Sequence, residues 1–525
     1  MKNLKIYLLA LLAFAFVIQS CDEDVDLILQ QEIENPLPGE VTGTPGSLDL
    51  SNYVSIGNSI AAGFQDGALY TDAQNQSFAT FLGTQFQVTG VGGQAFNVPS
   101  INSVNGLSGA NPAGGFFGRF ELSLSQLRPV PTEGELFGAF DGDNSALNNF
   151  AVPGMKVTDI SLPSLAGSNQ LYGRFASSPG TSTVLGDALA TDPTFFTYEL
   201  GSNDVLGYAT SGGANIADIT DAVSFQTSLQ TSLSALVASG AKGVVMNVPM
   251  MLTAPFFRAV PYNAVPLDAA TAQALNAGFA GFNQALAGMV QATLITQADM
   301  DQRMVAYQAG ANPILIFDES LEDLGPKFDL LGLPAAARAG LEPFRQSRPA
   351  VATDLPLLTA ATEIGRDVTG TGTVLSGISL PIADNFILTQ AEQVDVITAR
   401  VTYNTIISNV IQAINAAEGS TVLAEYDINV QLADIAGLNT ATATQLGLSA
   451  EAIAAADGTL GIIVDGVSLA PDFSPNGVFS TDGIHPNPRG HGIVANAMIQ
   501  LMNDTFGSTI PLMNVLALRG IIATD

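Results

Sequence analysis

The chain has no tryptophan, one cysteine and only two histidines among its 525 residues. A single cysteine excludes an intramolecular disulfide, and so few histidine and cysteine side chains argue against a zinc site. The lack of tryptophan argues slightly against a carbohydrate ligand, since sugars often stack on aromatic rings, although the 10 tyrosines and 28 phenylalanines could serve instead. If the protein uses a histidine as a general base, that base must be His485 or His491.

Basic side chains are also scarce, because 17 lysines and arginines stand against 48 aspartates and glutamates, for a net charge of −31. Such a charge argues against nucleic acid or anionic lipid headgroups as the main partner. No phosphate-binding or dinucleotide glycine motif occurs in a strand-to-helix context. Asp141, Asp143 and Ser145 resemble the start of a calcium loop, but Ala146 and Val152 occupy the positions of its turn glycine and bidentate glutamate. We therefore expect neither a cofactor nor a metal site.

The first 21 residues have the features of a targeting segment. Lys2 and Lys5 precede an apolar stretch over residues 6–18, which has the length of a signal-peptide core and falls short of the roughly 20 residues that span a bilayer. The stretch leads into Ser20-Cys21, which resembles the lipobox of bacterial lipoproteins. That resemblance implies lipid attachment at Cys21 and an anchor that holds the mature protein on a membrane without crossing it. An ordinary secretory signal is the alternative.

An acidic, proline-containing stretch follows the cysteine. Residues 22–26 look like the tract that directs lipoproteins to the cell surface in the Bacteroidota, although a solvated linker has the same composition. Residues 22–48 contain three prolines and no apolar periodicity, which predicts a tether. Together these segments predict an outer-membrane lipoprotein of the cell envelope, exposed at the surface if the acidic tract acts as such a signal, with residues 49–525 as the folded domain.

Short apolar or β-branched runs alternate with helical patterns through the rest of the chain. The predicted strands cover residues 53–56, 194–200, 243–248, 313–317 and 421–426, and the predicted helices cover 225–238, 390–417 and 487–502. This alternation favours a three-layer α/β/α fold with a parallel, flavodoxin-like sheet. Ligands bind beyond the carboxyl ends of the strands in such sheets, so residues after Ile56 and after Leu200 should meet.

Two stretches, near residues 90–150 and 250–385, fit no strand-helix unit. The first is rich in glycine, asparagine, serine and phenylalanine, and the second carries many prolines and apolar residues. We expect both to be large insertions that wall or cap the site, and plain surface loops are the alternative.

Both histidines lie in one short segment near the C-terminus. A serine nucleophile needs an imidazole to accept its proton and a carboxylate to orient that imidazole. Asp482 precedes His485 by three residues, and Gly483 allows a turn that can bring the two side chains together. His491 has no such neighbour and lies at the start of a predicted helix, which indicates a surface or packing residue.

Four short blocks resemble those of the SGNH/GDSL hydrolase family, in the family's order. They are Gly57-Asn58-Ser59-Ile60, Asn149-Phe150-Ala151-Val152-Pro153-Gly154, Gly201-Ser202-Asn203-Asp204 and Asp482-Gly483-Ile484-His485-Pro486. Alone, each could be an ordinary turn or helix cap. The first block departs from the family's name-giving pattern, because Asn58 stands in place of its aspartate and Ile60 in place of its leucine. That aspartate is not a member of the family's triad.

The resemblance implies an SGNH hydrolase fold with a Ser-His-Asp triad. Ser59 would attack an ester carbonyl, His485 would transfer the proton, and Asp482 would orient His485. The oxyanion hole would consist of the backbone N–H groups of Ser59 and Gly154 and the side-chain amide of Asn203.

The activity that this resemblance implies is hydrolysis of carboxylic esters by an esterase or lipase without a cofactor. The apolar insertions favour acyl lipids over acetylated glycans as the substrate. The alternatives are a carbohydrate O-acetylesterase and a surface lipoprotein of the same fold that binds a ligand without turnover. Oligomeric state does not follow from the sequence.

Overall fold

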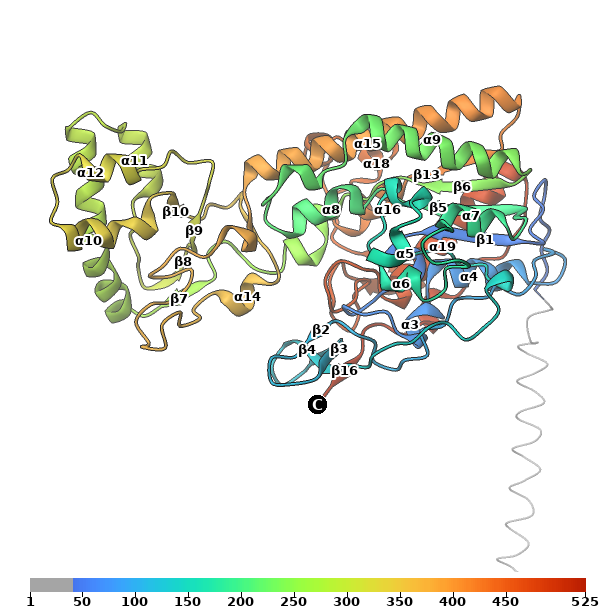
Figure 1. The fold of residues 1–525 in the computed structure, drawn as a ribbon, viewed down its shortest axis with the longest axis horizontal. Coiled ribbons are helices and arrows are strands. Elements are labelled where there is room, and N and C mark those ends of the chain that lie inside the picture. The colour runs from blue at the N-terminus through green and yellow to red at the C-terminus, as the bar shows by residue number, and fades with distance from the viewer. Residues whose placement is uncertain (1–40) are drawn as a thin grey trace, which may run out of the picture.

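A four-stranded parallel sheet forms the centre of the molecule. The computed structural model describes residues 41–525, so the predicted signal segment, Cys21 and the acidic tract lie outside the described residues. The strands lie in the order β1-β5-β6-β13 (Figure 1). They are β1 (Tyr53–Gly57), β5 (Phe195–Glu199), β6 (Lys242–Met246) and β13 (Leu423–Tyr426). Four of the five predicted strands are therefore confirmed as members of one parallel sheet.

Helices cover both faces of this sheet. On one face lie α9 (Ala222–Ala238) and α15 (Gln390–Glu418), and on the other lie α4 (Phe78–Phe86) and α19 (Pro488–Phe506). Successive side chains of a strand point to opposite faces, so Ile56 joins the core under α9 and α15 while Tyr53 joins the core under α4 and α19. The fold is therefore a three-layer α/β/α structure, and the three predicted helices are confirmed within a few residues.

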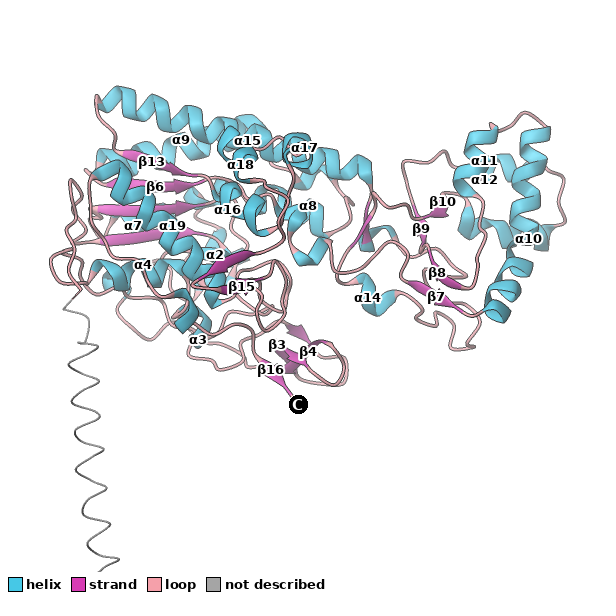
Figure 2. Cartoon of the chain, turned by 180° about the vertical axis from the view of Figure 1, so that it is seen from behind, coloured by secondary structure: helices cyan, strands magenta, loops and turns pink. Residues whose placement is uncertain are grey.

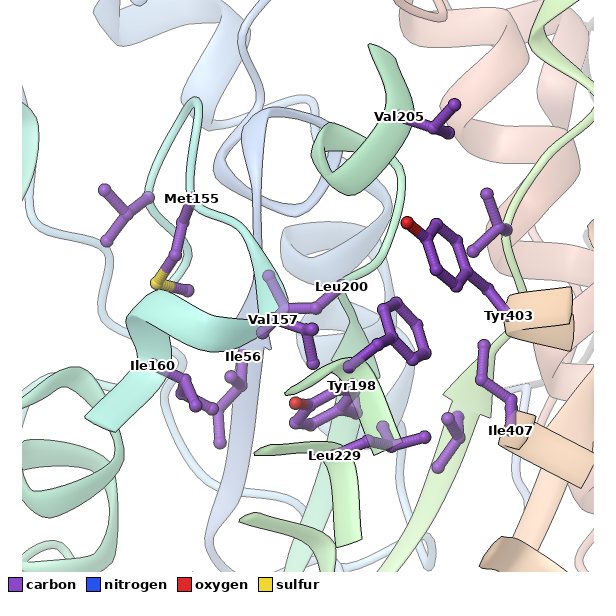
Figure 3. Close-up of a cluster of buried hydrophobic side chains, with 14 of the residues drawn as sticks. Ile56, Met155, Val157, Ile160, Tyr198, Leu200, Val205, Leu229, Tyr403 and Ile407 are labelled. Carbon is purple, nitrogen blue, oxygen red and sulfur yellow. The ribbon is translucent and has the colours of Figure 1, made fainter. Parts of the chain in front are cut away.

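Aromatic and branched side chains fill the layer beneath α9 and α15. Figure 3 shows Ile56, Tyr198, Leu229 and Ile407 converging from β1, β5, α9 and α15. The hydroxyls of Tyr198 and Ser232 share a hydrogen bond of 2.9 Å, which satisfies two polar groups that would otherwise be costly to bury. This packing holds the two helices against the strands whose carboxyl ends carry the predicted site.

An extended segment, residues 148–152, lies beside β1 at the edge of the sheet. The Phe150 N–H donates to the Ser55 carbonyl at 2.8 Å, and the Val152 N–H donates to the Gly57 carbonyl at 2.9 Å. This segment ends at the turn that contains Gly154. Its pairing therefore brings that turn to the carboxyl end of β1.

Most of the insertion at 250–385 forms a lobe that projects from one end of the sheet domain (Figure 2). Two hydrophobic clusters separate from the main core stabilise it. Its helices are α10 (Ala269–Gln291), α11 (Gln297–Arg303), α12 (Gly325–Asp329), α13 (Ala335–Leu341) and α14 (Ala360–Glu363), and its strand pairs are β7 (Val265–Leu267) with β8 (Gly310–Asn312), β9 (Leu315–Phe317) with β10 (Ser347–Pro349), and β11 (Leu355–Pro356) with β12 (Ile387–Leu388).

The fifth predicted strand, at 313–317, belongs to this lobe. It is β9, which pairs antiparallel with β10 rather than joining the parallel sheet. The prediction of its place was wrong, because a short apolar run indicates a strand without identifying the strand that pairs with it.

The insertion near 90–150 forms a small sheet against the domain. Its central strand, β3 (Phe116–Ser123), pairs antiparallel with β2 (Gly109–Ala110) and β4 (Arg128–Glu133), and parallel with the C-terminal strand β16 (Ala523–Thr524). The remaining elements are α2 (Ser59–Ala62), α3 (Thr71–Gln74), α5 (Leu165–Ser168), α6 (Gln170–Gly173), α7 (Val184–Leu189), α8 (Asn203–Thr210), α16 (Ile428–Ile435), α17 (Thr440–Gln445), α18 (Ala450–Ala455), β14 (Ile462–Val464) and β15 (Val467–Leu469).

The end of the predicted tether is part of the folded domain. The Gly43 N–H donates to the Thr89 carbonyl at 3.0 Å, the Ser47 N–H donates to the Phe506 carbonyl at 2.9 Å, and Leu48 is buried. The predicted boundary at residue 48 was therefore several residues too late, because composition alone does not reveal that a segment docks on the domain. Among residues 41–525, none of the helices has the length and apolar character needed to cross a membrane.

Candidate active site

Ser59, His485 and Asp482 form a continuous chain of hydrogen bonds. The Nε2 of His485 lies 2.9 Å from the Oγ of Ser59, and its Nδ1 lies 2.9 Å from the Oδ2 of Asp482. Ser59 follows β1, while His485 ends the loop before α19. Both side chains are largely buried, with exposed fractions of 7% for Ser59 and 9% for His485. The structure thus brings together the three residues predicted as a triad.

Four donors surround the Asp482 carboxylate. Its Oδ1 accepts from the backbone N–H groups of Ile484 (2.8 Å) and His485 (2.9 Å), and its Oδ2 accepts from the Gly67 N–H (2.9 Å) and from the His485 ring. Burial alone raises the pKa of Asp482, but the charge of His485 and these hydrogen bonds outweigh burial and lower that pKa to about 2. An ionised Asp482 accepts from Nδ1–H and leaves Nε2 as the acceptor for the serine proton.

Ser59 is the first residue of α2, directly after β1. The Asn58 side chain caps this helix, because its Oδ1 accepts from the Ile60 N–H at 3.2 Å. Asparagine and aspartate are equally good helix caps. Asn58 can therefore provide the local contacts that the family's aspartate would make, so the departure from the family pattern leaves the turn intact.

Glu199, at the end of β5, accepts hydrogen bonds from the backbone of this turn. Sequence reasoning did not identify this residue. Its Oε2 accepts from the N–H groups of Asn58 (3.1 Å) and Ala61 (3.3 Å). Burial raises the pKa of Glu199 to about 8, although these hydrogen bonds oppose the rise. A Cβ at Gly57 would lie 2.6 Å from the Ala61 Cβ and 3.0 Å from Glu199, so β1 can enter α2 this sharply only at a glycine.

The loop after α2 is hydrogen-bonded to the loop that carries Asp482 and His485. The Asp66 carboxylate accepts from the Thr481 N–H (2.9 Å) and hydroxyl (2.8 Å), and the Asp66 N–H donates to the Ser480 hydroxyl (3.1 Å). The small sheet of the 90–150 insertion joins this contact, because the Phe120 N–H donates to the Asp66 carbonyl at 2.7 Å. Sequence reasoning missed Asp66, whose partners Ser480 and Thr481 lie more than 400 positions away.

A cavity of about 70 Å³ lies beside Ser59 and His485. Its walls are mostly apolar, and they include Ile60, Leu206, Met250, Met251, Ile428 and Leu432. Residues 249–254, at the start of the second insertion, contribute to the wall, whereas no residue of 255–385, all of which the structure describes, lines the cavity. Most of the lobe packs around two hydrophobic clusters of its own at one end of the domain, so its predicted capping role stays a prediction.

A scan against protein-family models and a search of curated proteins found no match to this chain. The chemistry of the site therefore rests on its own geometry. A serine hydroxyl within hydrogen-bond reach of an imidazole, which in turn binds a carboxylate, is the arrangement required for nucleophilic catalysis. The adjoining apolar cavity can hold a small acyl group while the reacting carbonyl lies at Ser59.

The two further donors predicted for an oxyanion hole lie on the turn that contains Gly154 and at the start of α8. Asn203 begins α8, and its Nδ2 donates to the Met155 carbonyl at 3.1 Å, which ties α8 to the turn that contains Gly154. Asp204 strengthens this tie, because its Oδ2 accepts from the Val157 N–H at 2.9 Å. No hydrogen bond joins Gly154 or Asn203, both within the described chain, to Ser59. An oxyanion hole binds the substrate oxygen rather than the nucleophile, so the assignment of these donors stays a prediction.

His491 has no contact with the triad serine. It is fully buried within α19, and its Nδ1 accepts from the Phe78 N–H at the start of α4 at 3.2 Å. Burial lowers the pKa of His491 to about 3, so the ring is neutral. Of the two roles predicted for this residue, the structure therefore shows packing rather than surface exposure.

Proposed function

We propose that this protein is a serine esterase that hydrolyses carboxylic esters through Ser59, His485 and Asp482. The observation that carries the proposal is the unbroken chain of 2.9 Å contacts from Ser59 through His485 to Asp482. A merely structural buried serine does not need an imidazole oriented by a carboxylate with a lowered pKa. The resemblance of four loop blocks to the SGNH/GDSL hydrolases supports the same assignment.

The reaction follows from the positions of the three side chains. The Ser59 oxygen forms a bond to the ester carbonyl carbon, while its proton moves to the Nε2 of His485. The tetrahedral intermediate collapses when His485 gives that proton to the leaving alcohol, and an acyl group remains on Ser59. Water, deprotonated by the same imidazole, then attacks the acyl carbon, and the acid leaves as Ser59 regains its proton.

Asp482 and the oxyanion donors have separate tasks in this scheme. The carboxylate stabilises the imidazolium that forms in both steps. The N–H groups of Ser59 and Gly154 and the amide of Asn203 would bind the developing oxyanion. Each such donor acts mainly on the transition state, so it affects turnover more than substrate binding.

The arrangement of the sheet supports the family assignment. With the edge segment at 148–152 counted as a strand, the chain order across the sheet is second, first, third, fourth, fifth, which is the flavodoxin-like order. Ligands of such sheets bind at the carboxyl ends of the strands, next to the point where the strand order reverses. Ser59 follows β1 at that point.

The size of the cavity favours a short acyl group. A volume of about 70 Å³ holds roughly five water-sized groups, since one such group needs about 10–15 Å³. Pockets for larger ligands span roughly 300–1,000 Å³. We therefore place acetyl to butyryl esters ahead of long-chain lipids, which makes a carbohydrate O-acetylesterase the second candidate function.

The test is hydrolysis of p-nitrophenyl esters from acetate to palmitate by the protein, by Ser59→Ala and by His485→Ala. We expect activity on the short esters and its loss in both variants. Ser239→Ala, which changes an exposed serine at the end of α9, is the matched control. A fluorophosphonate probe should label the protein and Ser239→Ala but not Ser59→Ala.

The outcomes separate the candidate functions. Activity confined to p-nitrophenyl acetate, with release of acetate from acetylated glycans, would identify the O-acetylesterase. A folded protein that neither turns over any ester nor reacts with the probe would contradict the enzyme assignment and favour a binding protein.

We also propose that the protein is a lipoprotein of the cell envelope. The proposal rests on the signal-like segment that ends in Ser20-Cys21. Expression with a radiolabelled fatty acid should label the protein, and Cys21→Ser should lose both the label and the membrane fraction. Labelling that persists in Cys21→Ser would contradict acylation at this residue.

A further inference from the structure

Three carboxylates meet where the lobe joins the sheet domain. Glu319 follows β9, Asp384 precedes β12, and Glu392 lies in the first turn of α15, whose N-terminal end faces the lobe (Figure 1). One oxygen from each side chain lies within 4.8 Å of the others. Glu319 is exposed, Asp384 is half-buried and Glu392 is only 4% exposed. Three carboxyl groups therefore converge at a partly buried junction.

Two oxygens of this cluster are buried without a hydrogen-bond partner. The Oε2 of Glu392 caps α15, because it accepts from the Thr389 N–H at 2.5 Å and from the Thr389 hydroxyl at 2.8 Å. Its Oε1 has no donor, and neither has the Oδ1 of Asp384. Burying an unsatisfied carboxylate oxygen costs more free energy than burying an unsatisfied neutral group. A positively charged partner at these two atoms would therefore stabilise the folded chain.

The backbone of the sheet domain packs against Glu392 but donates no hydrogen bond to its Oε1. A Cβ at Gly213 would overlap the Glu392 carboxyl group, which shows how near the chain passes. The Gly213 N–H nevertheless donates to the Tyr208 carbonyl at 2.9 Å. The glycine therefore buries the carboxylate and leaves its Oε1 unsatisfied.

Basic side chains do not neutralise the cluster either. Within residues 41–525, no lysine or arginine forms an ion pair with Glu319, Asp384 or Glu392. Arg348, which binds the adjacent Asp318 at 2.5 Å, also binds Asp354 at 2.6 Å.

We propose that Glu319, Asp384 and Glu392 bind a calcium ion that fastens the lobe to the sheet domain. Carboxylate oxygens are the preferred ligands of hard divalent cations. Oxygens bound to one Ca²⁺ at 2.3–2.6 Å lie at most about 5 Å apart, and the three carboxylates already meet that limit. Mg²⁺ requires shorter bonds and a stricter octahedron. Water completes the coordination on the exposed side of Glu319.

Sequence reasoning predicted no metal site, because the three ligands share no motif. Two of them lie in the lobe and the third lies in α15, so the bound ion would connect the two parts of the molecule. An ion that binds the folded but not the unfolded chain stabilises the folded chain.

The site lies outside the cavity beside Ser59, so it does not depend on the proposed esterase function.

Terbium luminescence tests the site directly. Tb³⁺ replaces Ca²⁺ and emits when a nearby tyrosine is excited, and Tyr208 is close enough for Glu392 and Glu319 to perturb its hydroxyl. After removal of metals from the purified chain, we expect saturable Tb³⁺ emission that Ca²⁺ displaces. Glu319→Gln and Glu392→Gln should raise the Kd at least tenfold, and Tyr208→Phe should reduce the emission. Asp301→Asn, an exposed acid of the same lobe, should change nothing.

Thermal unfolding provides the second readout. At about pH 8, CaCl2 at about 5 mM, above the 10⁻⁴–10⁻³ M range of weak extracellular sites, should raise the Tm by about 2 °C or more over the value in EDTA. Glu319→Gln, whose side chain is exposed and should not disturb folding, should abolish this shift. The proposal is wrong if Ca²⁺ leaves the Tm of the unaltered chain unchanged, or if Tb³⁺ binds equally well to Glu319→Gln and Glu392→Gln.

Discussion

Ser59 and His485 lie 426 positions apart in the chain and 2.9 Å apart in space. Two loops bring them together. The loop after α2 leads from Ser59 to Gly67, whose N–H donates to the same Asp482 carboxylate that binds the His485 ring. Ser59, His485 and Asp482 therefore belong to one hydrogen-bonded unit, so a change in one of the two loops should alter the geometry of the other.

Asp482→Asn should lower kcat about 10³- to 10⁴-fold. The amide cannot accept from Nδ1–H as the ionised carboxylate does, so the imidazole loses the tautomer that accepts the Ser59 proton. The measurement is kcat on a short p-nitrophenyl ester, with circular dichroism to verify folding. Asp465→Asn, at an exposed turn, is the control. Turnover near the wild-type value would show that Asp482 is not the orienting acid.

Asn203→Ala should lower kcat about 10²- to 10³-fold and leave KM nearly unchanged. A donor in an oxyanion hole binds the charge that develops in the transition state rather than the neutral ester. Steady-state kinetics on p-nitrophenyl acetate separate the two parameters. Because Asn203 also donates to the Met155 carbonyl, thermal unfolding should accompany the kinetics. A raised KM with normal kcat would instead indicate a substrate-binding role.

Leu432→Ala should extend the range of acyl chains that the proposed esterase accepts. Leu432 lines the cavity and is only partly buried, so truncation enlarges the cavity by about three carbon-sized groups at moderate cost in stability. The ratio of kcat/KM for hexanoate over acetate should rise by roughly tenfold or more. Leu438→Ala, a partly buried leucine that does not line the cavity, should leave that ratio unchanged. An equal change in both variants would refute the assignment of this cavity to the acyl group.

Glu199→Gln should reduce the amount by which the unfolding free energy falls at alkaline pH. Burial raises the pKa of Glu199 from 4.5, its ordinary value, to about 8 in the folded protein. Below about pH 4.5 the side chain is protonated in both the folded and the unfolded chain, and its contribution to the unfolding free energy is then at its maximum. That contribution is lost as the pH rises to about 8, because the unfolded chain then releases a proton that the folded chain retains. Glutamine resembles the protonated side chain and does not titrate.

Urea unfolding at pH 6 and pH 9 measures this effect. The difference between the two unfolding free energies should be smaller in Glu199→Gln than in the unaltered chain, by an amount on the order of a few kcal/mol. Other buried acids, including Asp204, titrate in both proteins and cancel in the comparison. Identical pH dependence in the two proteins would show that Glu199 is ionised when folded.

The strands of the central sheet and the pair Asp482–His485 could be predicted because their signals are local, whereas Ser59 was identified through the resemblance of its block to the SGNH/GDSL family. Apolar runs at β1, β5, β6 and β13 each end at a turn, and the scarcity of histidine left only His485 or His491 as a base. An aspartate three residues before His485 can reach it through one turn. These features depend on a few adjacent residues, so the tertiary structure was not needed to find them.

Contacts between distant segments could not be predicted in this way. The place of β9 in an antiparallel pair, the position of the lobe away from the cavity, and the docking of residues 43–48 each depend on which surfaces pack together. Glu199 and Asp66 likewise bind partners more than 100 positions away, Asn58 and Thr481.

The sequence by itself therefore indicated the type of fold and, through the resemblance of four blocks to the SGNH/GDSL hydrolases, the residues Ser59, His485 and Asp482 that the structure brings together. Only the tertiary structure decided the size of the cavity beside Ser59, the contacts of Glu199 with the turn before Ser59, and the convergence of Glu319, Asp384 and Glu392. The physical reason is that periodicity and turn chemistry act within a few residues, whereas burial and the meeting of charges depend on how the whole chain packs.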